Sequence, residues 1–139
     1  MLEFEFPYAA TGIAGVLAFV LGLFWYHPKV MGTRWMEARG KEGVDPIKLH
    51  PKQIVVSLLL WLISASFYSF LIDILDINLV EGFFALSCLL WVAFAMPPIL
   101  MGALYTGHAF EAASIDASYQ LAGYYVFALV HIIFSTMMA

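Results

Sequence analysis

Four long apolar runs dominate the sequence and predict four membrane-spanning helices. They cover residues 8–26, 53–72, 82–107 and 117–138, and only the fourth contains an ionisable side chain, His131. A hydrocarbon core about 30 Å thick needs about 20 residues of helix. The runs are continuous rather than alternating, which excludes a membrane β-barrel. We therefore predict an all-α fold, an integral membrane bundle of four transmembrane helices forming a single domain over residues 1–139.

Charge is scarce and concentrated in one segment. All six Lys and Arg residues lie between residues 29 and 52, and the formal net charge is −4. Residues 27–52 carry six basic and three acidic side chains, and the other seven acids lie elsewhere. A nucleic-acid binder needs a broad basic patch, so this class is excluded. Because short basic loops stay in the cytoplasm, we expect loop 27–52 to be cytoplasmic and both termini to lie outside.

The basic loop is expected to contain a short helix between the first two spans. Pro28 suits the first position of a helix, and Met31, Trp35 and Ala38 would then share one face. Such a helix would lie on the lipid bilayer. Its basic side chains either contact anionic lipid or only fix the orientation of the chain.

Two features of the spans bear on helix packing. Pro97 and Pro98 interrupt the third run, where they predict a kink because proline has no backbone N–H to donate. Ala14, Ala18 and Gly22 place small side chains at four-residue spacing in the first run, which predicts a close helix–helix contact. Four helices leave little room for a solute path, so we also expect a homo-oligomer, most simply a dimer, with this stripe as one candidate interface.

Polar side chains near the basic loop are the first candidates for chemistry. His108 and Glu111 are three residues apart, a spacing that places two side chains on one face of a helix, and His27 lies near the same boundary. If a metal binds, these three are its ligands, and Glu37 and Asp116 are also available. The alternative is that they are ordinary polar groups at helix ends. The single cysteine, Cys88, excludes a disulfide framework within the chain, and no cofactor is expected.

His131 is the only ionisable residue well inside a predicted span. It either contacts a ligand, a proton path or a metal, or forms a hydrogen bond across the bundle to Ser64, Ser66 or Ser69. No second histidine lies at its depth, which argues against a bis-histidine haem.

Two segments resemble a known family. The run Trp25-Tyr26-His27-Pro28, followed by Gly32-Thr33-Arg34-Trp35-Met36, is similar to the Trp-Tyr-x-Pro and Gly-x-x-Trp-Met motifs of the small bacterial membrane proteins grouped as domain of unknown function 1761. Phe110-Glu111 and Gly123-Tyr124 match further family positions. The resemblance implies a four-helix protein of the bacterial inner membrane, with structural roles for Pro28, Gly32 and Gly123, and it supplies no activity.

Three functions remain open from the sequence. The leading hypothesis is an oligomeric inner-membrane protein that binds or passes a small ligand, ion or lipid near the cytoplasmic face. Its candidate ligand-binding residues combine the polar and aromatic positions above: Trp25, Tyr26, His27, Trp35, His108, Glu111, Tyr124 and His131. The alternatives are a membrane-embedded enzyme that acts on an apolar substrate through His108 and Glu111, and an accessory or scaffold subunit without chemistry.

Overall fold

The computed structural model describes residues 6–40 and 50–138, and within these ranges it contains helices and no strand. The elements in chain order are α1 (Tyr8–Trp25), the π-helix η1 (Pro28–Gly32), α2 (Thr33–Ala38), α3 (Pro51–Ile74), α4 (Val80–Leu90), the π-helix η2 (Trp91–Ala95), α5 (Met96–Thr106) and α6 (Phe110–Met138). Four helical stretches in the described chain are long and apolar enough to cross a membrane: Tyr8–Trp25, Pro51–Ile74, Val80–Thr106 and Phe110–Met138. The all-α prediction is confirmed, and the architecture indicates a multi-pass membrane protein.

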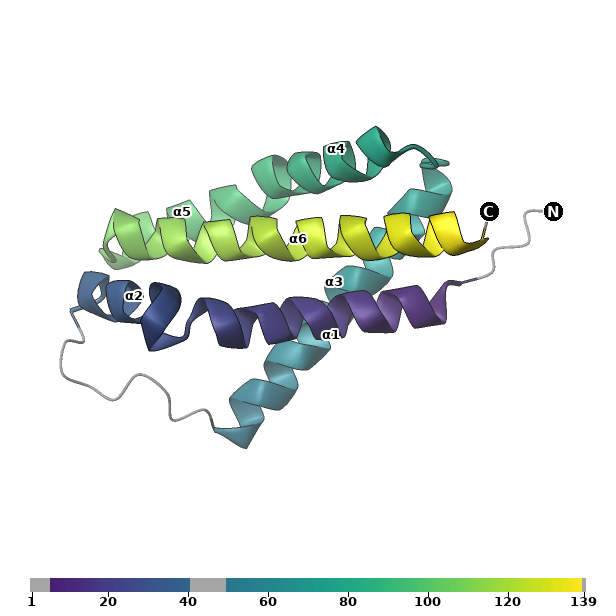
Figure 1. The fold of residues 1–139 in the computed structure, drawn as a ribbon. Coiled ribbons are helices and arrows are strands. Elements are labelled where there is room, and N and C mark those ends of the chain that lie inside the picture. The colour runs from purple at the N-terminus through teal and green to yellow at the C-terminus, as the bar shows by residue number, and fades with distance from the viewer. Residues whose placement is uncertain (1–5, 41–49, 139) are drawn as a thin grey trace.

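Helix α6 is the centre of the arrangement (Figure 1). It packs against α1 on one side and against α4 and α5 on the other, and α2 lies beside its first turns. Helix α3 packs against α1, which it crosses obliquely. We call the end of the bundle that holds α2 and the start of α6 the basic end. The opposite end, which holds Asp73 in the last turn of α3 and Asp76 in the α3–α4 connection, is the acidic end.

The small-residue stripe of α1 is filled from within the chain. Ala14 and Ala18 are fully buried. A Cβ on Gly15 would meet Leu62 of α3, and one on Gly22 would overlap the ring of Tyr119 from α6. The predicted helix–helix contact is therefore present, but α3 and α6 occupy it. The expectation that this stripe serves as a dimer interface is wrong for that physical reason.

A π-helical turn lies at each of the two places where proline affects the predicted helices, the start of the basic loop and the middle of the third span. Pro28 begins η1, which leads directly into α2, so the short helix expected after the first span exists. Pro97 and Pro98 occupy the first turn of α5, and the preceding η2 lets the Met96 N–H reach the carbonyl of Trp91. The wide π-helical turn therefore comes directly before Pro97 and Pro98, which have no backbone N–H to donate to the helix.

The fourth span begins earlier than the sequence suggested. Helix α5 ends at Thr106, Gly107 adopts the left-handed conformation (φ 69°), and α6 starts at Phe110 rather than at residue 117. Glycine ends a helix in this conformation without steric cost. Asp116 consequently lies within α6, in its second turn.

Aromatic rings form the middle of the core. Trp61 of α3 makes edge-to-face contacts with Tyr119 and Phe127 of α6, with ring centroids 5.3 and 5.6 Å apart. Tyr68 continues the chain of rings, 5.3 Å from Phe127. Its hydroxyl lies 2.8 Å from the hydroxyl of Ser87 on α4. Because water cannot reach such groups in a membrane, this pairing of polar atoms holds α3 to α4.

The ring contact with α6 predicts a cost for Gly123→Ala. A Cβ at position 123 would overlap the indole of Trp61. Because Trp61 is held by other rings, we expect the substitution to lower the free energy of unfolding by about 1–2 kcal/mol. Thermal unfolding in detergent measures this, with Gly12→Ala as the control because no atom lies within 4 Å of its new Cβ. Equal stability of the two variants would contradict the packing described here.

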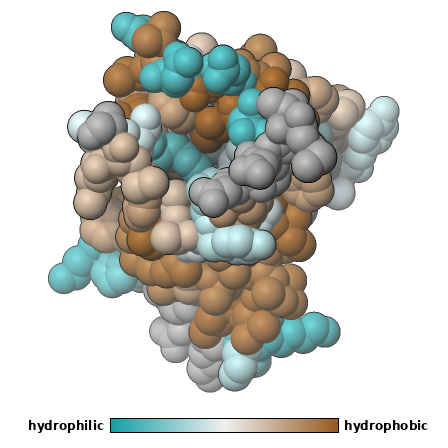
Figure 2. All heavy atoms as spheres, turned by 90° about the vertical axis from the view of Figure 1, so that its right-hand side faces the viewer, coloured by the Kyte–Doolittle hydropathy of each residue, from teal (hydrophilic) through white to brown (hydrophobic). Residues whose placement is uncertain are grey.

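The outer surface is apolar, as lipid contact requires. Large hydrophobic side chains stay exposed along every span, among them Phe67 (65%), Phe94 (70%) and Leu104 (79%). Figure 2 shows the end at which the chain termini lie, where hydrophobic residues dominate the visible surface and hydrophilic residues interrupt it. The exposed apolar surface fits the four candidate spans.

Candidate functional site

A cavity of about 590 Å³ opens at the basic end between α1, α2, α3 and α6. We call it the basic-end cavity. Apolar and aromatic side chains form most of its wall, and the polar groups are few. It is lined by Phe19, Gly22, Leu23, Tyr26, Gly32, Trp35, Met36, Gln53, Ile54, Ser57, Trp61, Asp116 and Tyr119. An apolar enclosure with a few convergent polar groups is the usual form of a small-molecule site.

Among the described residues, Asp116 is the only carboxylate that lines this cavity. Its Oδ1 accepts a hydrogen bond from the Tyr26 hydroxyl at 2.5 Å and another from the Trp35 indole Nε1 at 2.9 Å. The second oxygen, Oδ2, accepts no hydrogen bond from any described residue. One acceptor atom of the carboxylate therefore joins α6 to the end of α1 and to α2, while the other stays open for a ligand.

Tyr26 is kept in its protonated form. Burial raises the pKa of its phenol far above the ordinary value, and the hydrogen bond to Asp116 and the negative charge of Asp116 raise it further. The group therefore remains a donor to Asp116 at any physiological pH.

The turn after α1 brings these donors to Asp116. His27 has an extended backbone, Pro28 begins η1, and the Gly32 N–H donates to the His27 carbonyl at 3.1 Å. This compact turn brings position 32 so close to the Tyr26 carbonyl that a Cβ would overlap it. Trp35 then follows on α2, with its ring edge-to-face against Tyr26, centroids 5.7 Å apart.

A smaller cavity of about 250 Å³ lies on the other side of Asp116, between α2, α5 and α6. We call it the side cavity; its lining includes Arg39, Pro98, Thr106, His108 and Asp116. The Arg39 guanidinium lies over the Trp35 ring, 4.6 Å from the centroid. Its Nε is buried and has no hydrogen-bond partner among the described residues.

The structure brings some of the predicted site residues together. Tyr26, Gly32 and Trp35 line the basic-end cavity, and His108 lines the side cavity. Tyr124 lies deeper in the bundle, where its ring contacts Trp61 at a centroid distance of 6.4 Å. These positions separate a cluster at the basic end from residues of the packed core.

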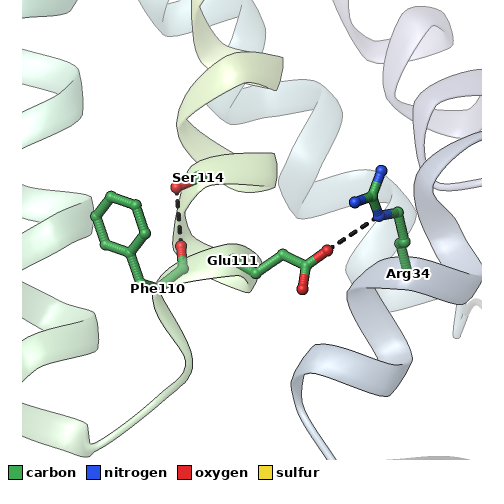
Figure 3. Close-up of polar contacts among 4 residues, drawn as sticks. All are labelled: Arg34, Phe110, Glu111 and Ser114. Carbon is green, nitrogen blue, oxygen red and sulfur yellow. Dashed lines mark hydrogen bonds and ion pairs between the residues drawn. The ribbon is translucent and has the colours of Figure 1, made fainter.

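Three other residues predicted to bind a ligand, His27, Trp25 and Glu111, line neither the basic-end cavity nor the side cavity. The His27 side chain accepts a hydrogen bond from the Lys29 N–H at 3.2 Å and caps η1. The Trp25 indole N–H is buried and finds no partner within the described chain. Glu111 forms an exposed ion pair with Arg34, with Nε and Oε1 3.0 Å apart (Figure 3).

The geometry predicted for His108 and Glu111 is wrong. Since α5 ends at Thr106 and α6 begins at Phe110, His108 lies in the connection and shares no helix face with Glu111. Its Nδ1 lies 3.1 Å from the Thr106 hydroxyl, whereas Glu111 turns to Arg34. No group of three potential metal ligands is found among the described residues, so His27, His108 and Glu111 do not form the metal site considered above.

His131 forms the serine contact considered from the sequence. Its Nε2 lies 3.1 Å from the Ser69 hydroxyl, which in turn lies 2.6 Å from the hydroxyl of Thr11. The three side chains join α1, α3 and α6. A cavity of about 470 Å³ at the acidic end is lined by His131, Ser69 and Asp73 among others. His131 therefore lies far from Asp116 and belongs to another part of the bundle.

The sequence prediction treats Asp116 as an available metal ligand but does not include it among the ligand-binding residues, and the predicted fourth span begins one residue after it. A signal for its position does exist in the sequence. Asp116, Tyr119 and Gly123 follow at intervals of three and four residues, which places them on one face if the helix starts early enough. The buried Tyr119 and the Trp61 contact at Gly123 show that this face points inward.

Comparison with known proteins identifies the family of this chain. The family described as "Protein of unknown function (DUF1761)" matches residues 9–132, a range that contains every residue lining the basic-end cavity. The chain belongs to the DUF1761 family. No curated protein and no solved structure matches it. Because the DUF1761 description carries no activity, the function of this member has to be inferred from its site.

Proposed function

We propose that this DUF1761 protein binds a membrane-borne amphiphile in the basic-end cavity, with Asp116 as the polar anchor. The ligand has an apolar body and a headgroup that donates hydrogen bonds. The single observation that carries the proposal is the open Oδ2 of Asp116, a residue that lines a cavity with mostly apolar and aromatic walls. An open carboxylate oxygen beside apolar and aromatic walls suits a ligand that has an apolar body and a headgroup that donates hydrogen bonds.

The location of the cavity favours a ligand from the membrane. It lies at the end of the spans, beside the segment that carries all Lys and Arg residues. By the charge rule for short loops, this end is proposed to face the cytoplasm. The family supports the proposal that the membrane is the bacterial inner membrane. An amphiphile in that leaflet would have its headgroup near Asp116 and its chain against Phe19, Leu23 and Trp61.

Binding is favoured over an open channel. Between the basic-end cavity and the acidic-end cavity, the core is filled by Ala65, Tyr68 and Phe127, all of which are almost fully buried. Such a core leaves no continuous path through one chain. The dimer expected from the sequence stays a prediction, and ligand binding does not require it because one chain supplies the whole cavity. The enzyme alternative loses its basis, since His108 and Glu111 do not converge.

Native mass spectrometry with added dodecylamine, a long-chain amine, tests this proposal. We compare the unmodified chain with Asp116→Asn, which retains an acceptor for Tyr26 and Trp35 but loses the negative charge. A hydrogen bond to a charged group contributes about 1.5–3 kcal/mol, so the variant should bind at least ~10-fold more weakly. Glu111→Gln is the matched control on the same helix, outside the cavity. The proposal fails if the unmodified chain does not bind the amine, or if Asp116→Asn binds it as well.

A further inference from the structure

The side cavity contains two opposite charges that do not pair with each other. Arg39 and Asp116 both line it. The described residues contain one ion pair, and that pair joins Arg34 to Glu111. Opposite charges in a partly buried space attract each other strongly unless something between them satisfies both. A ligand with one positive and one negative group would satisfy both charges.

From this we infer that the bound headgroup is zwitterionic, with an ammonium group at Asp116 and a phosphate at Arg39. The inference rests on the proposed function and narrows it to one ligand class, the aminophospholipids, of which phosphatidylethanolamine is the simplest. Its ammonium N–H groups would donate to the open Oδ2 of Asp116. Its phosphate oxygens would accept from the guanidinium of Arg39.

Arg39 is the cationic group of the side cavity that would bind an anion. Its Nε is buried without a partner, and a buried cationic donor left unpaired is unfavourable. The guanidinium stacks on the Trp35 ring and Arg39 lines the side cavity, and a planar guanidinium matches the geometry of phosphate oxygens. His108 lines the same cavity, where it adds a second nitrogen donor or acceptor.

The two cavities suit the two parts of a phospholipid. Asp116 lines both of them. The side cavity of about 250 Å³ holds the charged residues, and the basic-end cavity of about 590 Å³ presents apolar and aromatic walls to an acyl chain. A soluble zwitterion such as phosphoethanolamine has the same headgroup chemistry but would leave the apolar cavity empty.

The test measures lipid retention by the full chain in native mass spectrometry. Phosphatidylethanolamine is compared with phosphatidylglycerol, which lacks the amine, and with phosphatidylcholine, whose quaternary nitrogen has no N–H to donate. We expect at least ~10-fold more retention of phosphatidylethanolamine. Arg39→Gln should remove this preference, and Arg34→Gln, on the same helix but paired outside the cavity, should keep it. Equal retention of the three lipids, or an unchanged preference in Arg39→Gln, overturns the inference.

Two further probes distinguish a lipid ligand from a soluble one, and failure of the zwitterion inference from failure of the proposed function. Dodecylamine carries the amine and the chain but no phosphate, so its binding should depend on Asp116 and not on Arg39. If it binds in this way while the lipids do not differ, the zwitterion inference fails and the proposed function stands; if neither binds, both fail. Phosphoethanolamine tests the soluble source: Arg39-dependent binding at least as tight as that of the lipid supports the zwitterion but overturns the lipid assignment.

Discussion

A Gly32→Ala substitution is expected to disrupt the basic-end cavity. The new Cβ would overlap the backbone carbonyl of Tyr26, which cannot move without unwinding η1. Once the turn opens, Trp35 and Tyr26 can no longer both donate to Asp116. We expect a loss of about 3 kcal/mol in the free energy of unfolding, at the upper end for overpacking, together with loss of amphiphile binding.

Thermal unfolding and native mass spectrometry of the same preparations measure both effects. Gly12→Ala is the matched control, because its Cβ meets open space on α1. A Gly32→Ala protein with unchanged stability and unchanged binding would mean that the η1 turn does not hold the site together.

Trp61→Ala is expected to be the most destabilising single substitution in the core. Its indole makes ring contacts with Tyr119, Tyr124 and Phe127 and is 7% exposed. Each aromatic pair contributes about 0.5–1.5 kcal/mol, and a cavity of this size adds to the cost, so a loss of about 3–5 kcal/mol is expected. The same change would enlarge the basic-end cavity, which Trp61 lines.

Denaturant or thermal unfolding in detergent checks this value against Leu60→Ala. Leu60 is the neighbouring residue on α3, is 58% exposed and should contact lipid. Its truncation is expected to change stability by less than about 1 kcal/mol, because little packing is lost. Similar losses for the two variants would show that α3 does not pack on α6 through Trp61.

The sequence was sufficient for the helices because lipid restricts the choices. Uncharged runs such as residues 53–72 can only be helices at that length, and the observed α3 (Pro51–Ile74) differs by a few residues. The short helix after Pro28 and the interruption before Pro97 were also predictable, because proline has fixed local effects. For the basic loop, the prediction can be compared with the structure only in part, since residues 41–49 lie outside the described residues.

The site was less predictable because it depends on how three distant segments meet. Tyr26 and Trp35 stood out as aromatic residues at a span boundary, but nothing local shows that both donate to one carboxylate 81 or 90 residues away. The spacing of His108 and Glu111 suggested a shared face only if both lay on one helix. Gly107 ends the helix between α5 and α6, so the spacing of the two residues does not place their side chains on one face.

The small-residue stripe of α1 shows a similar limit. The spacing of Ala14, Ala18 and Gly22 predicts close approach of another helix, and this was correct. Whether that helix comes from the same chain or from a second copy is decided by the whole packing. Here Tyr119 lies over Gly22 and donates to the Ala18 carbonyl at 2.8 Å, which closes the stripe from within.

Photo-crosslinking with a long-chain amine that carries a diazirine in its chain tests the central claim most directly. The amphiphile should bind in the basic-end cavity, so labelled peptides should map to the lining residues Met36, Ile54 and Trp61. Labelling should disappear in Asp116→Asn and persist in Glu111→Gln. Labels spread over the outward-facing Val55, Leu59 and Leu60, with no dependence on Asp116, would contradict the claim.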